Sequence, residues 1–314
     1  MHAQNSKKIA VVGTGIIGAS WAAYFLARGY TVAATDPAPG AQQRLRSLVD
    51  ACWPTLERMG LHESASIDRL EFHDNVAATV ADAFFIQESG PERLELKREL
   101  MRELDAAAPA ETLIATSSSG IPISQVQDVA RHPERMLIGH PFNPPHLIPL
   151  VEVVGGEATS LQAIDQAMQF YAGIGKKPIH IRREVKGHVA NRLQAALWRE
   201  AIYLVQEGVA SVSDIDAAIA HGPGLRWALL GPFLNMHLSG GAGGMDHFLE
   251  HLGPPIEDWW ADLGTVTLTP ELNQTLVQQV NEAIGAGDMA RIVAQRDAVL
   301  LELLRLKSAH DRLP

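Results

Sequence analysis

Two ionisable side chains, His140 and Glu152, lie in the segment RMLIGHPFNPPHLIPLVEVVGG (residues 135–156), which otherwise favours strands. A neutral imidazole can take a proton from a hydroxyl group and return it, and a paired carboxylate stabilises the charged ring. A lone histidine at the end of a strand is more often structural or solvated. The segment therefore allows two interpretations: polar edges of a buried sheet, or one half of a proton-transfer device.

The elements around this pair alternate between strand-like runs and helical stretches, which predicts an α/β fold with a doubly wound, mostly parallel sheet. The runs are LEFHD, AFFIQES, TLIATSSS, RMLIGHPFN, LVEVVGG and KPIHIRR. Ligands of such sheets bind beyond the carboxyl ends of the strands. We therefore expect QESGPERLELK, TSSSG and GHPFNPP to converge on one crevice.

The N-terminal stretch KKIAVVGTGIIGASWAAYFLARGYTVAATD predicts a strand, a glycine-rich turn, a helix at residues 16–27 and a second strand that ends at Asp36. Gly13 allows the tight turn, Gly15 lets backbone amides approach a pyrophosphate, and Gly18 permits close helix packing. The carboxylate of Asp36 can accept hydrogen bonds from the ribose hydroxyls of NAD and repels the 2′-phosphate of NADP. This Rossmann-type pattern predicts that the chain binds NAD.

The pattern changes near residue 185, where apolar residues begin to recur at intervals of three and four, as in HVANRLQAALWREAIYLVQEGVAS. We expect a dinucleotide-binding domain at residues 1–185 and an all-helical domain at residues 186–314. The apolar faces of the helical part are large for its length. They favour pairing of two subunits, and a homodimer is expected.

The composition narrows the class of protein. The net charge is −10 and basic residues are dispersed, which argues against nucleic-acid binding. No stretch approaches the ~20 uninterrupted apolar residues of a membrane span, and the N-terminus lacks an export signal. A single cysteine, Cys52, cannot form an internal disulfide and fits a reducing compartment. These features predict a cytoplasmic globular protein.

Several motifs together resemble the 3-hydroxyacyl-CoA dehydrogenase superfamily over nearly the whole chain: HPFNPPHLIPLVEVVGG, VKGHVANRLQ and the glycines at residues 13–18. QESGPERLELK, HPERM, ALWREA and GGAGGMDHFLEHLGP resemble more narrowly the branch of carnitine dehydrogenase and lambda-crystallin (gulonate dehydrogenase), whose substrates are free polar 3-hydroxy acids. The resemblance implies an NAD-binding domain, a helical domain for substrate binding and dimerisation, and oxidation of a 3-hydroxy to a 3-keto group.

The resemblance also implies roles for four residues. His140 matches the family's base, which removes the hydroxyl proton, and Glu152 matches the glutamate that orients it. Ser119 in TSSSG would hydrogen-bond the substrate oxygen, although either preceding serine could do so. Asn191 in VANRL would hold the substrate carbonyl, whereas its structural alternative is to satisfy backbone groups at a helix start.

Three further positions match family residues near the nicotinamide ribose: Glu92 and Lys97 in PERLELK, and Asn143 beside the histidine. The alternative for Glu92 and Lys97 is a solvated, charged edge at a helix start, where the helix dipole favours the glutamate. The two interpretations have equal weight.

The substrate-binding residues are less constrained. Arg226 in GPGLRWALLGPF can hold a free carboxylate with two hydrogen bonds, and its alternative is a surface arginine. A cage formed by Trp198, Trp227, Trp259 and Trp260 would suit a trimethylammonium group. Core packing is the expectation for each tryptophan singly, and for Trp198 above all.

The chain departs from the better-known acyl-CoA enzymes at positions near the acyl pocket. Ser117 replaces an asparagine, Gly120 and Ile121 follow the serine where a bulky apolar residue is usual, and His188 replaces an aromatic residue. These changes put a fatty acyl-CoA substrate in doubt more than they do the chemistry.

Three functions remain open. The favoured one is an NAD-dependent dehydrogenase of a small free 3-hydroxy acid, carnitine-like or gulonate-like. The second is the same reaction on a 3-hydroxyacyl-CoA such as 3-hydroxybutyryl-CoA, and the third is a non-catalytic NAD-binding structural protein. No metal site is expected, because the histidines form no HExxH pattern or cysteine-flanked cluster and the dinucleotide accepts the hydride.

Overall fold

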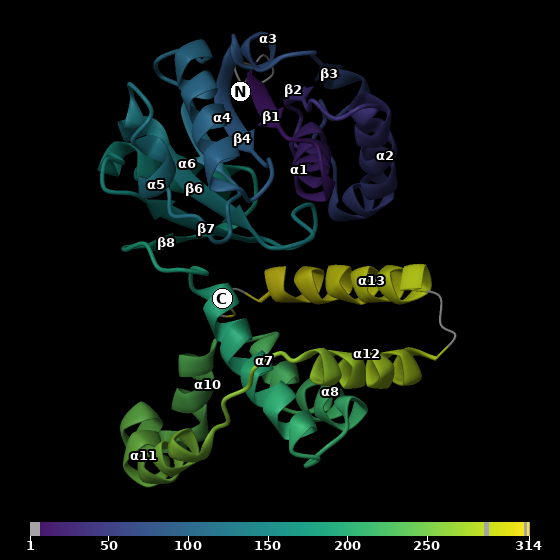
Figure 1. Cartoon of the computed structure of the whole chain (residues 1–314), viewed down its shortest axis with the longest axis vertical. Coiled ribbons are helices and arrows are strands. Elements are labelled where there is room, and N and C mark those ends of the chain that lie inside the picture. Colours follow the sequence, from purple (N-terminus) through teal and green to yellow (C-terminus); the bar gives the residue numbers. More distant parts are fainter. Residues whose placement is uncertain (1–6, 286–288, 311–312, 314) are drawn as a thin grey trace. The chain divides into compact units, whose positions relative to one another are not determined.

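The computed structural model describes residues 7–285, 289–310 and 313. The chain divides into two compact units, the first ending at Arg192 and the second beginning at Leu193 (Figure 1). This division lies within a helix, seven residues beyond the end of the NAD-binding domain that the sequence pattern suggests at residue 185.

The N-terminal unit is built on an eight-stranded sheet with the strand order β3-β2-β1-β4-β5-β6-β7-β8. Neighbouring strands are parallel except β6 and β7, which are antiparallel. The strands are β1 (Lys8–Val12), β2 (Thr31–Thr35), β3 (Leu70–Phe72), β4 (Ala83–Glu88), β5 (Leu113–Thr116), β6 (Met136–Pro141), β7 (Leu150–Gly155) and β8 (Lys177–Ile181). The predicted α/β fold is confirmed, and each run that favours a strand contains one.

Helices cover both faces of this sheet (Figure 1). Successive residues of β1 point to opposite faces, so Ile9 joins one apolar cluster and Ala10 the other. The first cluster includes residues of α1 (Ile16–Ala27), α2 (Ala41–Met59) and α6 (Leu161–Gly173), and the second includes residues of α3 (Val76–Val80), α4 (Leu94–Ala107) and α5 (Ser124–Gln127). The strand ends therefore project from a core that is packed on both sides.

The C-terminal unit is helical, as expected. Its helices are α7 (Ala190–Gln206), whose first residues belong to the N-terminal unit, α8 (Val212–His221), α9 (Pro223–Trp227), α10 (Pro232–Ser239), α11 (Gly244–Asp262), α12 (Pro270–Ile284) and α13 (Met289–Ser308). Helix α10 packs against α11, and α8 packs against α9 and α12. Among the helices described, none is both long enough and apolar enough to cross a membrane.

The expectation that Trp198 packs in a core is wrong for the single chain, because its side chain is 55% exposed. Helix α7 buries only Val205 among its described residues, so the face that carries Trp198 is uncovered. Trp259 and Trp260 of α11 are likewise exposed. Helical spacing predicts which apolar residues share a face, but it does not show what covers that face.

Candidate active site

The glycine-rich turn between β1 and α1 has the geometry of a phosphate cradle. Gly13 has a φ of 88°, and a Cβ atom there would lie 2.7 Å from the backbone of Ser89 and Gly90. A Cβ on Gly18 would lie 1.9 Å from the carbonyl oxygen of Gly13. Nothing lies within 4 Å of the corresponding position at Gly15. The turn is therefore tightly packed from behind and open at Gly15, where a ligand would approach the amides at the start of α1.

Asp36, directly after β2, supports this turn. Its Oδ2 accepts a hydrogen bond from the amide of Thr14 at 2.8 Å, and its Oδ1 accepts one from the amide of Ala38 at 2.9 Å. A carboxylate has about four acceptor positions, so each oxygen keeps one for a ribose hydroxyl. The half-buried carboxylate and the open turn fit NAD.

His140 and Glu152 face each other across the antiparallel pair β6 and β7, where they are direct register partners. The Nδ1 of His140 lies 2.8 Å from Oε2 of Glu152, and the side chains are 8% and 0% exposed. Because a carboxylate only accepts, the Nδ1 atom carries the hydrogen, and the lone pair of the neutral ring is on Nε2. His140 and Glu152 are therefore twelve residues apart in the sequence because they occupy opposed positions on two strands that one loop connects.

Glu152 also holds the start of α7. Its Oε1 accepts hydrogen bonds from the amides of Val189 and Ala190 at 3.0 and 2.9 Å. Burial alone would raise the pKa of Glu152, but the hydrogen bonds from His140, Ala190 and Val189 outweigh burial and lower it. One ionised carboxylate therefore orients the imidazole and fixes the backbone next to Asn191, a half-buried residue.

Glu92 organises the serine loop after β5. Its Oε1 accepts hydrogen bonds from the Ser118 hydroxyl and from the amides of Gly120 and Ile121, at 2.7, 2.7 and 3.0 Å. Burial would raise the pKa of Glu92, but these hydrogen bonds and the charge of Lys97 lower it. An ionised Glu92 thereby fixes the loop on both sides of the residue between Ser118 and Gly120.

The three serines of this loop differ in their partners. Ser117 accepts a hydrogen bond from Gln87 at 2.8 Å and pairs with the Ser89 hydroxyl at 2.9 Å, while Ser118 is bonded to Glu92. The hydroxyl of Ser119 has no hydrogen bond with the described residues. Ser119 is therefore the serine of the three that is free to bind a ligand.

Lys97 is buried and does not belong to a solvated edge, since the whole residue is only 1% exposed. Its ammonium donates to both carboxylate oxygens of Glu88, at 3.1 and 3.0 Å, and lies 3.8 Å from Glu92. Glu88 ends β4 and is itself fully buried. The two charges neutralise each other beneath the serine loop, which is a structural arrangement that the sequence pattern does not reveal.

Two other expected site residues are exposed. Asn143 lies in the loop after β6, before a cis peptide bond to Pro144. Arg226 lies on α9 of the C-terminal unit. Neither side chain has a hydrogen bond or ion pair with the described residues.

His188, where the chain departs from the acyl-CoA enzymes, lies beside His140. The residue is 3% exposed, its ring centroid is 4.9 Å from that of His140, and its backbone φ is 52°. Its Nε2 donates to the carbonyl oxygen of Ser118 at 3.0 Å. Burial and the charge of His140 lower the pKa of His188, although the Ser118 contact and nearby carboxylates oppose them. His188 thus joins the serine loop to the segment that Glu152 holds.

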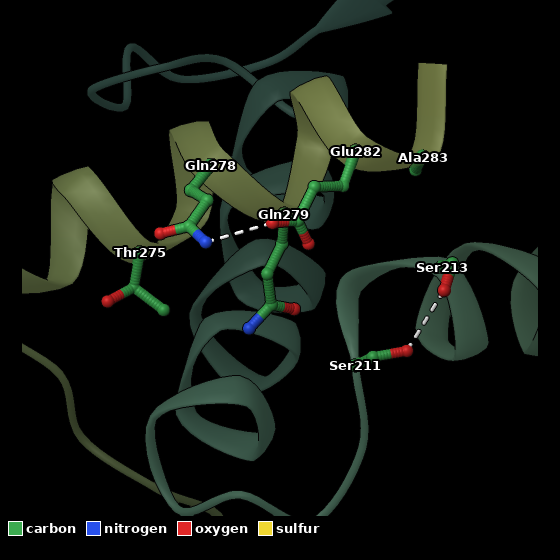
Figure 2. Close-up of a pocket in the computed structure, with 7 residues that line it drawn as sticks. All are labelled: Ser211, Ser213, Thr275, Gln278, Gln279, Glu282 and Ala283. Atoms are coloured by element: carbon green, nitrogen blue, oxygen red, sulfur yellow. Dashed lines mark hydrogen bonds between the residues drawn. The ribbon is translucent and has the colours of Figure 1, made fainter. Parts of the chain in front are cut away.

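A separate polar hollow of about 440 Å³ opens between α8 and α12 in the C-terminal unit (Figure 2). Its lining residues are Ser211, Ser213, Thr275, Gln278, Gln279, Glu282 and Ala283. The polar groups pair with one another: Ser211 with Ser213, and Gln278 with Glu282. The hollow contains none of the expected site residues.

Comparisons with known proteins support the expected family. Residues 8–219 match the model of the 3-hydroxyacyl-CoA dehydrogenase NAD binding domain, and residues 187–285 match that of its C-terminal domain. The second match begins next to the expected domain boundary.

Among its relatives, the chain is 52% identical to an L-carnitine dehydrogenase of Streptomyces coelicolor, over 96% of this chain and 95% of that protein. It is 47% identical to an L-carnitine dehydrogenase of Bacillus cereus, over 98% of this chain and 94% of that protein.

Solved structures agree with this result. An NAD-dependent 5-formyl-3-hydroxy-2-methylpyridine 4-carboxylic acid 5-dehydrogenase superposes with a TM-score of 0.83 at 28% identity, covering 96% of this chain and 99% of that one. A 3-hydroxybutyryl-CoA dehydrogenase of Escherichia coli gives 0.63 at 29% identity, covering 74% and 49%. The chain belongs to the 3-hydroxyacyl-CoA dehydrogenase family and is an NAD-dependent oxidoreductase.

Proposed function

We propose that this enzyme oxidises the 3-hydroxy group of L-carnitine to a 3-keto group, with NAD as the electron acceptor. The observation that carries the proposal is the buried hydrogen bond between His140 and Glu152, which leaves Nε2 of the imidazole as a proton acceptor at the carboxyl end of β6. Relatives at 44–52% identity that are named L-carnitine dehydrogenase support a small free 3-hydroxy acid as the substrate class.

The residues of the chain divide the work as follows. His140 accepts the hydroxyl proton at Nε2, and the charge of Glu152 stabilises the imidazolium that forms. When bound, NAD supplies the acceptor for the hydride that leaves the carbon bearing this hydroxyl group. The free hydroxyl of Ser119 donates to the substrate oxygen. The side-chain amide of Asn191, at the start of α7, holds the substrate carbonyl. The glycines at residues 13–18 and Asp36 hold the dinucleotide.

The substrate assignment also has support from the C-terminal unit. L-carnitine has a carboxylate and a trimethylammonium group, which a guanidinium and aromatic rings bind respectively. Arg226 and Trp227 are adjacent and exposed on α9, so they are our candidates for these contacts. The acyl-CoA alternative has less support, because the Escherichia coli 3-hydroxybutyryl-CoA dehydrogenase is only 29% identical to this chain, whereas the relatives named L-carnitine dehydrogenase are 44–52% identical.

We also propose that the enzyme is a homodimer that pairs through the C-terminal unit, and that it works in the cytoplasm. Many large apolar residues of this unit are exposed, such as Trp198 at 55%, Phe233 at 74% and Trp260 at 65%. Exposed apolar surface of this kind is typical of an interface. Sedimentation at micromolar concentration checks the dimer, and a monomer alone would contradict it.

The test of the substrate is a panel of free acids: L-carnitine, L-gulonate and 3-hydroxybutyrate, each with NAD. We expect NADH to form with L-carnitine and a 3-keto product to appear in equal amount. Activity with L-gulonate alone would overturn the choice of substrate but leave the reaction type in place. Activity with 3-hydroxybutyrate equal to that with L-carnitine would show that no site recognises the trimethylammonium group.

A further inference from the structure

Three potential metal ligands share one face of α11 in the C-terminal unit. His247, Glu250 and His251 have the spacing HxxEH, so the histidines are one helical turn apart and the glutamate lies on the same face. Their ligand atoms all lie within 4.8 Å of one another, and the two ring centroids are 3.9 Å apart. The helix backbone therefore holds the three groups near the spacing that one ion requires.

The hydrogen bonds around this cluster prepare His251 for a metal. Its Nδ1 lies 3.0 Å from the carbonyl oxygen of His247. A carbonyl only accepts, so Nδ1 carries the hydrogen and Nε2 of the neutral ring presents a lone pair. Histidines that bind metals usually donate their other N–H in this way, which fixes the tautomer and the ring orientation.

The neighbouring His237 is arranged differently. Its Nδ1 accepts a hydrogen bond from the amide of Met245 at 3.1 Å, so the hydrogen of the neutral ring is on Nε2. His237 is therefore not a fourth ligand in this arrangement, and it offers a matched control.

We propose that His247, Glu250 and His251 bind one divalent transition-metal ion of the zinc class. Two imidazoles and one carboxylate form a ligand set that zinc uses in sites with an open fourth position, here on the solvent side. Magnesium and calcium prefer oxygen ligands alone and do not suit the cluster. The cluster does not match the HExxH pattern, because its glutamate comes directly before the second histidine and not directly after the first.

The position of the cluster suggests what the ion does. Pro254 and Pro255 lie inside α11 and have no amide hydrogen, so the carbonyl oxygens four residues earlier, those of Glu250 and His251, lose their helical hydrogen bonds. The ion joins the side chains of these same residues to His247 one turn before. It therefore stabilises the helix at the turn that the prolines weaken.

The test is calorimetric titration of the full-length, untagged and metal-free protein with zinc. We expect one saturable site per chain, and binding at least roughly tenfold weaker in H247A and H251A, since each variant loses one of only three protein ligands. E250Q should bind more weakly than the wild type. H237A should bind like the wild type, and magnesium should give no saturable signal.

A second measurement separates binding from folding. Zinc should raise the thermal unfolding midpoint of the wild type and of H237A, but not that of H251A. The absence of saturable zinc binding, or binding by H247A and H251A equal to that of the wild type, would overturn the proposal. Neither outcome bears on the dehydrogenase activity, because the proposed reaction uses no residue of this cluster.

Discussion

The two units of this chain differ in how completely they bury their apolar side chains. In the N-terminal unit, Trp21 stacks on Phe25 with their ring centroids 5.1 Å apart, and these two residues and Tyr171 are fully buried. In the C-terminal unit, the described apolar residues that are buried number only four: Val205, Phe248, Leu272 and Leu301. The first unit is therefore complete as a folded body, whereas the second has apolar surface that a partner would cover.

This difference assigns separate properties to the two units. The proposed proton-transfer pair, His140 and Glu152, depends on the β6–β7 register, which the packed core of the N-terminal unit fixes. In our proposal, subunit pairing and recognition of the substrate's ends depend on the exposed surface of the helical unit. Variants of one unit should therefore change its property and leave the property of the other unit unchanged.

The largest effect should come from His140→Gln. We expect turnover to fall by roughly 10²- to 10⁴-fold, since the variant has no proton acceptor, while NAD binding is retained. Steady-state rates and calorimetric NAD titration measure the two properties. His180→Gln, at an exposed histidine of β8, is the control. Unchanged turnover would remove His140 from the mechanism.

Leu193→Glu tests the exposed surface of the helical unit. Leu193 of α7 is 59% exposed in the single chain, and a charge at a buried dimer contact should weaken pairing by at least roughly tenfold. Arg199→Glu, at an exposed residue of the same helix, also introduces a glutamate and serves as the control. Sedimentation over a range of concentrations compares them. Equal dimerisation of both variants would show that this part of α7 lies outside the interface.

His188→Phe tests the connection between the serine loop and α7. The variant keeps a ring beside His140 but loses the hydrogen bond to the Ser118 carbonyl, a contact worth about 1 kcal/mol, or roughly fivefold in rate. We expect kcat to fall by that factor, with little change in the KM for NAD. His188→Asn keeps a donor and tolerates the φ of 52°, so it should restore part of the loss. No recovery in a folded Asn variant would argue against the hydrogen bond.

Asp36→Ala should weaken the preference for NAD over NADP by roughly tenfold, because it removes the charge that repels the 2′-phosphate. Asp36→Asn removes the same charge but keeps an acceptor for the amide of Thr14 or Ala38. The ratio of kcat/KM for the two dinucleotides is the measurement. A wild type that uses both equally well would contradict the role of Asp36.

Lys176 should affect the pH dependence of stability. Burial lowers its pKa from 10.5 to about 7, so between these values the unfolded chain holds a proton that the folded chain has released. Stability should therefore rise with pH above 7, by about 1 kcal/mol per pH unit, and Lys176→Met should flatten this rise. Denaturant unfolding at pH 7 and 8 compares the two proteins. Parallel profiles would exclude this contribution.

The same contrast between units explains how much of the molecule was predictable from sequence. Local patterns predict the strands and the glycine turn, because each depends on nearby residues. The pairing of His140 with Glu152 came from the resemblance to the family, and the two residues are register partners of one antiparallel pair. The buried pair of Lys97 and Glu88 joins α4 to β4, and sequence spacing does not show that packing. The exposure of Trp198 was missed because helical periodicity does not show what covers a face.

The measurement that tests the central claim most directly is the ratio of kcat/KM for L-carnitine to that for 3-hydroxybutyryl-CoA, with NAD and one preparation of the enzyme. A free acid as the substrate predicts NADH formation with L-carnitine and a ratio well above one. A ratio well below one would contradict the account, and would leave Arg226 and the exposed tryptophans without a role in substrate recognition.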